Sequence, residues 1–109
     1  MVEYILNLNS IFGALSDPTR RDILSRVGDK ELSISEIAKF YQLTFAAISK
    51  HLNVLEKAHL ILKRRQGKQQ LVQLAPAALK DASEYLKHYE SLWNDRLDSL
   101  EQYLEAIQK

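Results

Sequence analysis

The sequence predicts a mainly helical fold that contains one small β-hairpin, with the elements in the order α-α-α-α-β-β-α. Apolar residues recur at helical spacing in five segments of the chain. They alternate with polar residues only between positions 60 and 74, as the strands of a hairpin do. The length of 109 residues, with 46% apolar and 27% charged residues, indicates one globular domain over residues 1–109.

Two helices are predicted before residue 30. The first spans residues 4–15, where the apolar residues share one face. The second begins after Asp17, a residue that can cap a helix, and has Pro18 at its first position, where a missing N–H does no harm. It ends at Gly28. Both helices are expected to bury their apolar faces in the core.

Two further helices are predicted at residues 33–41 and 44–58. Ser33 and Glu36 have the spacing of a capping box, in which each side chain bonds the other residue's backbone N–H. Thr44 is a good cap for the next helix.

The helix at 44–58 has two different faces at about 100° per residue. Ile48, Leu52 and Leu55 lie on one side. The opposite side is free of acids and consists of Ala46, Lys50, Asn53 and Lys57, with Ser49 on its flank.

The hairpin is predicted over residues 60–74, with Gln66-Gly67-Lys68 as its turn. Gly67 can adopt the positive φ that tight hairpin turns require. Pro76 then begins a long helix that runs to about residue 107.

Positive charge is concentrated between residues 41 and 75. This segment holds six basic side chains and one acidic one, Glu56, whereas the segments on either side hold more acids than bases. A basic face favours a polyanionic partner, because neutralising phosphates releases condensed counterions. A helix pair at 33–58 followed by a basic hairpin therefore predicts a winged helix-turn-helix on double-stranded DNA. Its second helix would enter the major groove, and the wing would lie on the backbone or in the minor groove.

The predicted DNA contacts follow from side-chain chemistry. Asn53 can pair with adenine through two hydrogen bonds, and Lys50 can reach guanine or a phosphate. Hydroxyl groups suit phosphate oxygens, and the apolar front of the helix can contact only apolar groups such as a thymine methyl. The predicted DNA-binding residues are Thr44, Phe45, Ala46, Ser49, Lys50, Asn53, Lys57, Arg64, Arg65, Lys68 and Gln69.

Three stretches of the chain carry motifs that are similar to those of a known protein family: ALSDPTRRDILSRV (14–27), ELSISEIAKFYQLTFAAISKHLNVLEKAHLI (31–61) and KRRQGKQQLVQL (63–74). Together they resemble the ArsR family of bacterial winged-helix repressors, and WNDRLDSLEQYL (93–104) is similar to a branch that lacks the metal-binding cysteines. The resemblance implies a homodimeric repressor that binds a palindromic operator, with residues 44–58 as its recognition helix. One departure is His59, where the family usually has a glycine that closes this helix. A histidine can adopt the left-handed conformation at some cost, so a weaker cap is expected.

The last helix carries an apolar seam with a seven-residue spacing, wider than one small domain can cover. The first helix is apolar enough to join it. The predicted dimer interface comprises Ile5, Leu8, Phe12, Leu86, Tyr89, Trp93, Leu97 and Leu100. Tyr89 and Trp93, with Arg96, could instead line a small-molecule pocket. Packing is the preferred interpretation, and the sequence identifies no effector.

Metal sites and cofactors are not expected. The chain has no cysteine, which excludes disulfides and thiolate ligands. Ser33 and Ser35 stand where one type of family metal site has cysteines, and hydroxyls bind soft metals poorly. A metal-responsive repressor with a site on the last helix is an open alternative. The residues available for it are Asp81, Glu84, His88 and Glu90.

Catalysis and a membrane partner are not expected either. The sequence has no glycine-rich phosphate loop and no convincing nucleophile–base–acid set. No apolar run is long enough to cross a bilayer, and residues 1–8 lack the pattern of a signal peptide. A cytoplasmic DNA-binding protein is therefore predicted, with a winged-helix protein–protein interaction module as the alternative.

Overall fold

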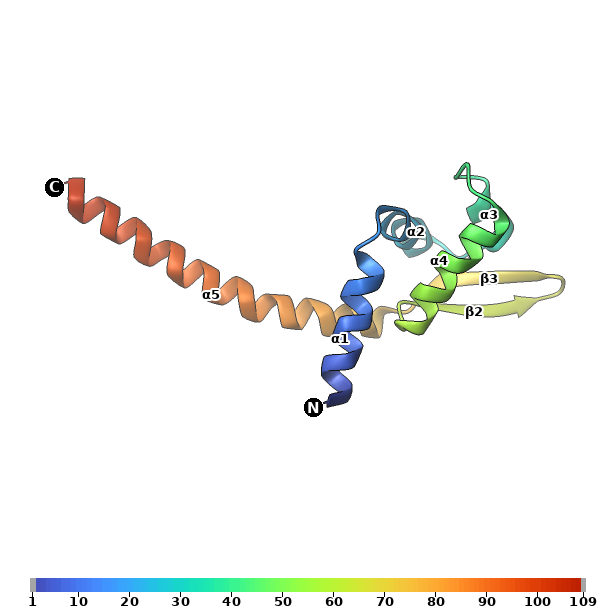
Figure 1. Cartoon of the computed structure of the whole chain (residues 1–109), viewed down its shortest axis with the longest axis horizontal. Helices are drawn as coiled ribbons and strands as arrows, with labels where there is room; N and C mark the ends of the chain where they lie inside the picture. The colour runs from blue at the N-terminus through green and yellow to red at the C-terminus, as the bar shows by residue number, and fades with distance from the viewer. Residues whose placement is uncertain (1, 109) are drawn as a thin grey trace.

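The computed structural model describes residues 2–108, and it describes side chains from Leu8 onward. The elements are α1 (Val2–Leu15), α2 (Pro18–Asp29), β1 (Leu32–Ser33), α3 (Ile34–Ala38), α4 (Phe45–Lys57), β2 (Ile61–Gln66), β3 (Gln69–Leu74) and α5 (Pro76–Gln108). Figure 1 shows α2, α3 and α4 grouped beside the β2–β3 hairpin, with α1 crossing the start of α5. The predicted mainly helical fold with a small hairpin is confirmed.

The short connection between α1 and α2 is stabilised by side chains of the segment Asp17-Pro18-Thr19-Arg20-Arg21. The Asp17 carboxylate accepts a hydrogen bond from the Arg20 N–H at 3.0 Å and so caps α2. The Arg20 Nε donates to the Ala14 carbonyl at 2.7 Å, and Arg21 Nη1 donates to the Leu15 carbonyl at 2.7 Å. These arginines satisfy carbonyls at the end of α1, where the helix leaves them without partners.

The hairpin belongs to a three-stranded antiparallel sheet with the order β1-β3-β2. β1 was not predicted, because two residues are too few to show alternation and its partner lies far along the chain. Leu32 pairs with Val72, and Ser33 pairs with Leu71. Ser33 also caps α3 through the predicted capping box with Glu36.

The third helix is shorter than the predicted span of residues 33–41. It begins at Ile34, because Ser33 is in β1, and it ends at Ala38, after which residues 39–43 form turns and bends. Tyr41 lies in this turn and donates a hydrogen bond from its hydroxyl to the Asp22 carboxylate of α2. This contact with α2 holds Tyr41 in the turn, so α3 does not continue to residue 41 as predicted.

The core lies between the helices and the sheet. Ile48, Leu52 and Leu55 of α4 are fully buried, together with Ile23 of α2 and Ile37 of α3. These α4 residues are the ones that helical spacing placed on a single apolar side. The predicted two-faced character of this helix is therefore confirmed.

The whole molecule measures 70 × 34 × 21 Å along its principal axes. α5 extends far beyond the rest of it (Figure 1). Ala78 and Ala82 are buried near its start. From Leu86 to Gln108 every residue is exposed. In the described part of the chain, no helix combines the length and the apolar character that crossing a bilayer requires.

Candidate nucleic-acid interface

The outer face of α4 is directed away from the core. Thr44 caps the helix by accepting a hydrogen bond from the Ala47 N–H at 3.1 Å. Four of the predicted DNA contacts lie side by side on this face and, with Ala47, line one shallow concavity: Ala46, Ser49, Lys50 and Asn53. Lys57 is exposed in the last turn of the same helix.

The C-terminus of α4 is closed by His59, which adopts the left-handed conformation with φ of 60°. The N–H of His59 donates to the Glu56 carbonyl, and the N–H of Leu60 donates to the Leu55 carbonyl, both at 3.0 Å. This pair of bonds is the Schellman arrangement, in which glycine is the usual left-handed residue. The chain direction after α4 is thus kept although a histidine occupies the position.

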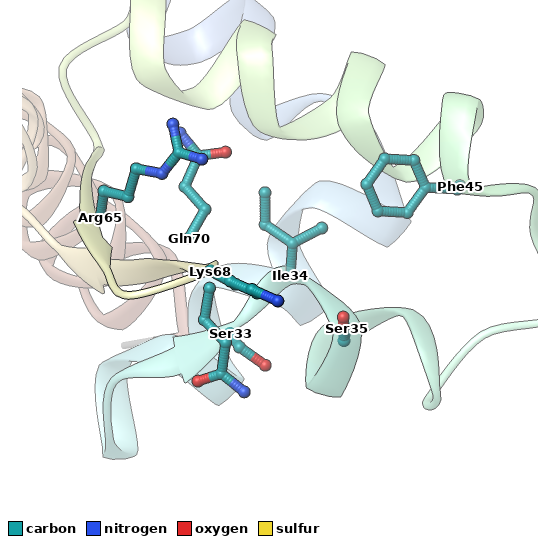
Figure 2. Close-up of a pocket in the computed structure, with 8 residues that line it drawn as sticks. Ser33, Ile34, Ser35, Phe45, Arg65, Lys68 and Gln70 are labelled. Atoms are coloured by element: carbon teal, nitrogen blue, oxygen red, sulfur yellow. The ribbon is translucent and has the colours of Figure 1, made fainter.

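A cleft of about 360 Å³ separates the wing from the start of α4. Figure 2 shows Arg65 and Gln70 on the wing, Phe45 on the first turn of α4, and the side chains of Lys68 and Ile34 between them. The cleft is completed by three polar side chains: Ser33, Ser35 and Gln69. It combines two cationic side chains with the exposed ring of Phe45, which suits a phosphate backbone and an adjacent apolar group.

Lys63 fastens the base of the wing to α4. Its Nζ donates to the Asn53 Oδ1 at 2.8 Å and lies 3.5 Å from a Glu56 carboxylate oxygen. Only 11% of the Lys63 side chain is exposed. The sequence did not indicate this contact, which depends on how the hairpin packs against the helix.

Arg64 points to the other face of the sheet, as the alternation of a strand requires. It forms a two-bond ion pair with Glu31, with nitrogen–oxygen distances of 2.6 and 2.8 Å. The Arg64 guanidinium holds the pKa of the Glu31 carboxyl below its usual value. The structure therefore separates Arg64 from Arg65 and Lys68, with which it was grouped as a predicted DNA contact.

His51, on the flank of α4, joins this helix to the α1–α2 junction. Its Nδ1 lies 3.4 Å from Arg20 Nη1 and 3.8 Å from an Asp17 carboxylate oxygen. The Arg20 backbone N–H and the nearby His51 lower the pKa of Asp17. Both partners lie more than 30 positions from His51 in the chain, so no local sequence pattern indicates them.

A second polar cluster links α2 to the turn before α4. The Arg26 guanidinium lies 3.9 Å from the centre of the Phe40 ring and donates to Asp22 at 2.9 Å. Partial burial and the hydrogen bond to Asp22 raise the pKa of Tyr41 to about 12. The cluster holds the turn that precedes α4 against α2.

The predicted dimer residues differ in their surroundings. Leu8 is buried within the single chain, and Phe12 is half-buried against the core. The side chain of Ile5 lies outside the described residues. The remaining residues of the set are exposed on α5: Leu86, Tyr89, Trp93, Leu97 and Leu100.

The metal alternative receives no support from geometry. In the part of the chain whose side chains are described, no three His, Cys, Asp or Glu residues come together as a metal-binding group. His88 of α5 instead stacks edge-on against Tyr89, with ring centres 6.1 Å apart.

Comparisons with known proteins agree with this geometry. A family model described as a helix-turn-helix domain matches residues 15–64. The transcriptional repressor SdpR of Bacillus subtilis (strain 168) is 32% identical over 82 residues, which cover 75% of this chain and 91% of SdpR. The structure of an ArsR-like transcriptional regulator from Rhodococcus sp. RHA1 has a TM-score of 0.74 at 32% identity, covering 90% of this chain and 92% of that one. The crystal structure of another ArsR family transcriptional regulator has a TM-score of 0.76 at 31% identity, covering 81% and 91% of the two chains.

Proposed function

Because this chain belongs to the ArsR family of winged helix-turn-helix transcriptional regulators, we propose that it is a homodimeric repressor of a palindromic operator. SdpR, a similar protein, is itself a transcriptional repressor. The proposed role requires binding to double-stranded DNA and no catalytic step.

The acid-free outer face of α4, which adjoins a cationic cleft at the wing, is the observation that carries this proposal. The nearest acid on the helix, Glu56, is turned toward Lys63 of the wing. Ser49, Lys50 and Asn53 are thus presented together without a carboxylate between them. A helix face with donors and no acid matches the acceptor-rich major groove.

The contacts divide by chemistry. Lys50, Asn53 and the apolar pair Phe45–Ala46 face the bases in the major groove. Thr44 and Ser49 bind phosphate oxygens near the start of α4, and Lys57 reaches the backbone beyond its end. On the wing, Arg65, Lys68 and Gln69 follow the backbone or the minor groove. Arg64 is a weaker candidate for a DNA contact, because its charge is paired with Glu31.

The exposed apolar stripe of α5 supports the homodimer. Leu86, Tyr89, Trp93, Leu97 and Leu100 are each about half exposed or more in the single chain. A contiguous stripe of this size on a helix that projects alone is typical of a protein interface. A two-fold pairing through α5 would place two α4 helices roughly 34 Å apart, one turn of DNA.

Selection from a randomised duplex library tests the proposal, combined with a salt titration of the selected duplex. We expect two inverted half-sites with centres about one DNA turn apart, and affinity that falls steeply with salt. Sequence-independent binding by a monomer would contradict the proposal and favour a protein-interaction module that uses α5.

A further inference from the structure

The contact between Lys63 and Asn53 places a wing residue against a side chain on the DNA-facing side of α4. The Lys63 Nζ lies 2.8 Å from the Asn53 Oδ1. Among residues 8–108, Lys63 is the only one that forms a hydrogen bond with the Asn53 side chain. Lys63 is held in place by its pairing opposite the fully buried Val72 and by the second contact to Glu56.

The chemistry of the two groups determines how the amide is oriented. An ammonium group has three donors and no acceptor, so it can bind only the oxygen of an amide. The opposite orientation would set the amide NH2 against the ammonium, donor against donor. Asn53 therefore turns its Oδ1 toward the wing and its NH2 away from it.

We infer that Lys63 determines the base preference of Asn53 by holding its Oδ1 toward the wing, which leaves the NH2 as the group that the amide presents to the major groove. This inference rests on the proposed function, because it requires α4 in the groove. The bidentate pairing with adenine predicted from the sequence needs the Oδ1 directed at the base, where it can accept from the adenine N6 amino group. The Lys63 contact uses one lone pair of the Oδ1 and holds this atom toward the wing instead.

Guanine becomes the favoured base at this position. Its major-groove edge presents two acceptors, N7 and O6, to the two N–H donors of the amide. Thymine offers one acceptor, O4. Adenine presents one acceptor, N7, but its amino donor lies beside it, where the second donor of the Asn53 amide would meet it. Cytosine presents only an amino donor, which cannot pair with the NH2 of Asn53. Lys63 is thus a positioning residue that sets specificity without touching a base.

Library selection with the full-length wild-type protein and the Lys63→Met variant tests this inference. The position read by Asn53 is identified as the one whose preference disappears in Asn53→Ala. We expect guanine there for the wild type. In Lys63→Met the freed Oδ1 should shift the adenine-to-guanine ratio toward adenine by about tenfold, within the range of one good base contact. Lys63→Arg keeps a donor and should keep guanine.

Glu56→Gln is the matched control. It weakens the other Lys63 contact and leaves the Asn53 contact in place, so the preferred base should not change. A purely mechanical role of Lys63 in holding the wing would lower affinity for all duplexes equally and leave the selected motif unaltered in both Lys63 variants.

Asn53→Asp provides a second variant that does not disturb the base of the wing, because residue 53 is exposed. A carboxylate keeps the contact to Lys63 but has no donor, so guanine should be lost and cytosine gained at this position. Wild-type selection of adenine, or an unchanged motif in Lys63→Met and Asn53→Asp, would overturn this inference but not the proposed function. If the wild type selects no sequence, the proposed function falls with it.

Discussion

Phe45 occupies the first position of α4 with 62% of its surface exposed. It lines the cleft between the helix and the wing, where Figure 2 shows its ring on the α4 side. An exposed ring at the front of a DNA-facing helix has no hydrogen bond to offer a base edge. Its contribution to specificity would come from contact with the methyl group of thymine.

Replacing thymine by deoxyuridine in the operator tests this contact, because it removes one methyl group and leaves base pairing intact. We expect one position in each half-site at which the replacement weakens binding about threefold to fourfold per half-site, the value of one buried carbon. Fluorescence anisotropy of position-by-position substituted duplexes measures it. The Phe45→Ala variant should bind the thymine and deoxyuridine duplexes equally well, and retained discrimination in this variant would assign the methyl contact to another residue.

His59 holds a left-handed conformation that costs a residue with a Cβ about 1–2 kcal/mol. Glycine removes this cost but loses about 0.5–1 kcal/mol through the entropy of the unfolded chain. We therefore expect His59→Gly to raise the free energy of unfolding by about 0.5–1 kcal/mol. Urea denaturation followed by circular dichroism measures the change. His59→Ala keeps a Cβ and should not stabilise; equal stabilisation by both variants would point to the imidazole rather than to the backbone.

At the level of elements, the wing divides its basic side chains between two faces. Arg65 lines the cleft on the α4 side, whereas Arg64 pairs with Glu31 on the other side. We expect Arg65→Ala or Lys68→Ala to weaken binding to all duplexes and to reduce the salt slope by about one per protomer. Titration of the operator complex between low and physiological salt measures the slope.

The matched control for this prediction is the double variant Glu31→Gln/Arg64→Gln, which removes an ion pair without changing net charge. Its salt slope should equal that of the wild type. A slope reduced as much as in Lys68→Ala would show that Arg64 leaves Glu31 and contacts a phosphate.

Helical spacing and capping chemistry were enough to predict most elements. The two faces of α4, its Thr44 cap and the hairpin turn at Gly67 are local, so the sequence signal is complete in a few residues. β1 could not be predicted, because Leu32 and Ser33 become a strand only by pairing with β3.

The candidate site was predictable as a set of residues but not as a set of contacts. Strand alternation separates Arg64 from Lys63 and Arg65, but only packing against α4 determines which face meets the helix. The ion pair of Arg64 with Glu31 joins residues 33 positions apart, so no local pattern reports it. The DNA contacts of the individual residues stay predictions.

At the level of the whole molecule, the packing of a single chain does not explain why α5 carries a long exposed apolar stripe. Its residues from Leu86 to Gln108 are exposed along a helix that projects from the body in Figure 1. Average helices in such domains are far shorter and gain most of their stability from packing of an apolar face. A second copy that pairs through α5 would bury this stripe and position two α4 helices on one duplex.

Leu97→Glu tests the pairing, because Leu97 is 55% exposed and a charge there should leave the single chain folded. Two carboxylates brought together across a two-fold interface cost several kcal/mol, so we expect a monomer at micromolar concentration. Light scattering after size-exclusion chromatography measures the mass, and anisotropy should show affinity for the full operator reduced to that of one half-site. Gln102→Glu adds the same charge to the opposite side of α5 and should remain a dimer with unchanged affinity. Dissociation of both variants would indicate a general effect of charge on α5, and a dimeric Leu97→Glu would place the interface elsewhere on the chain.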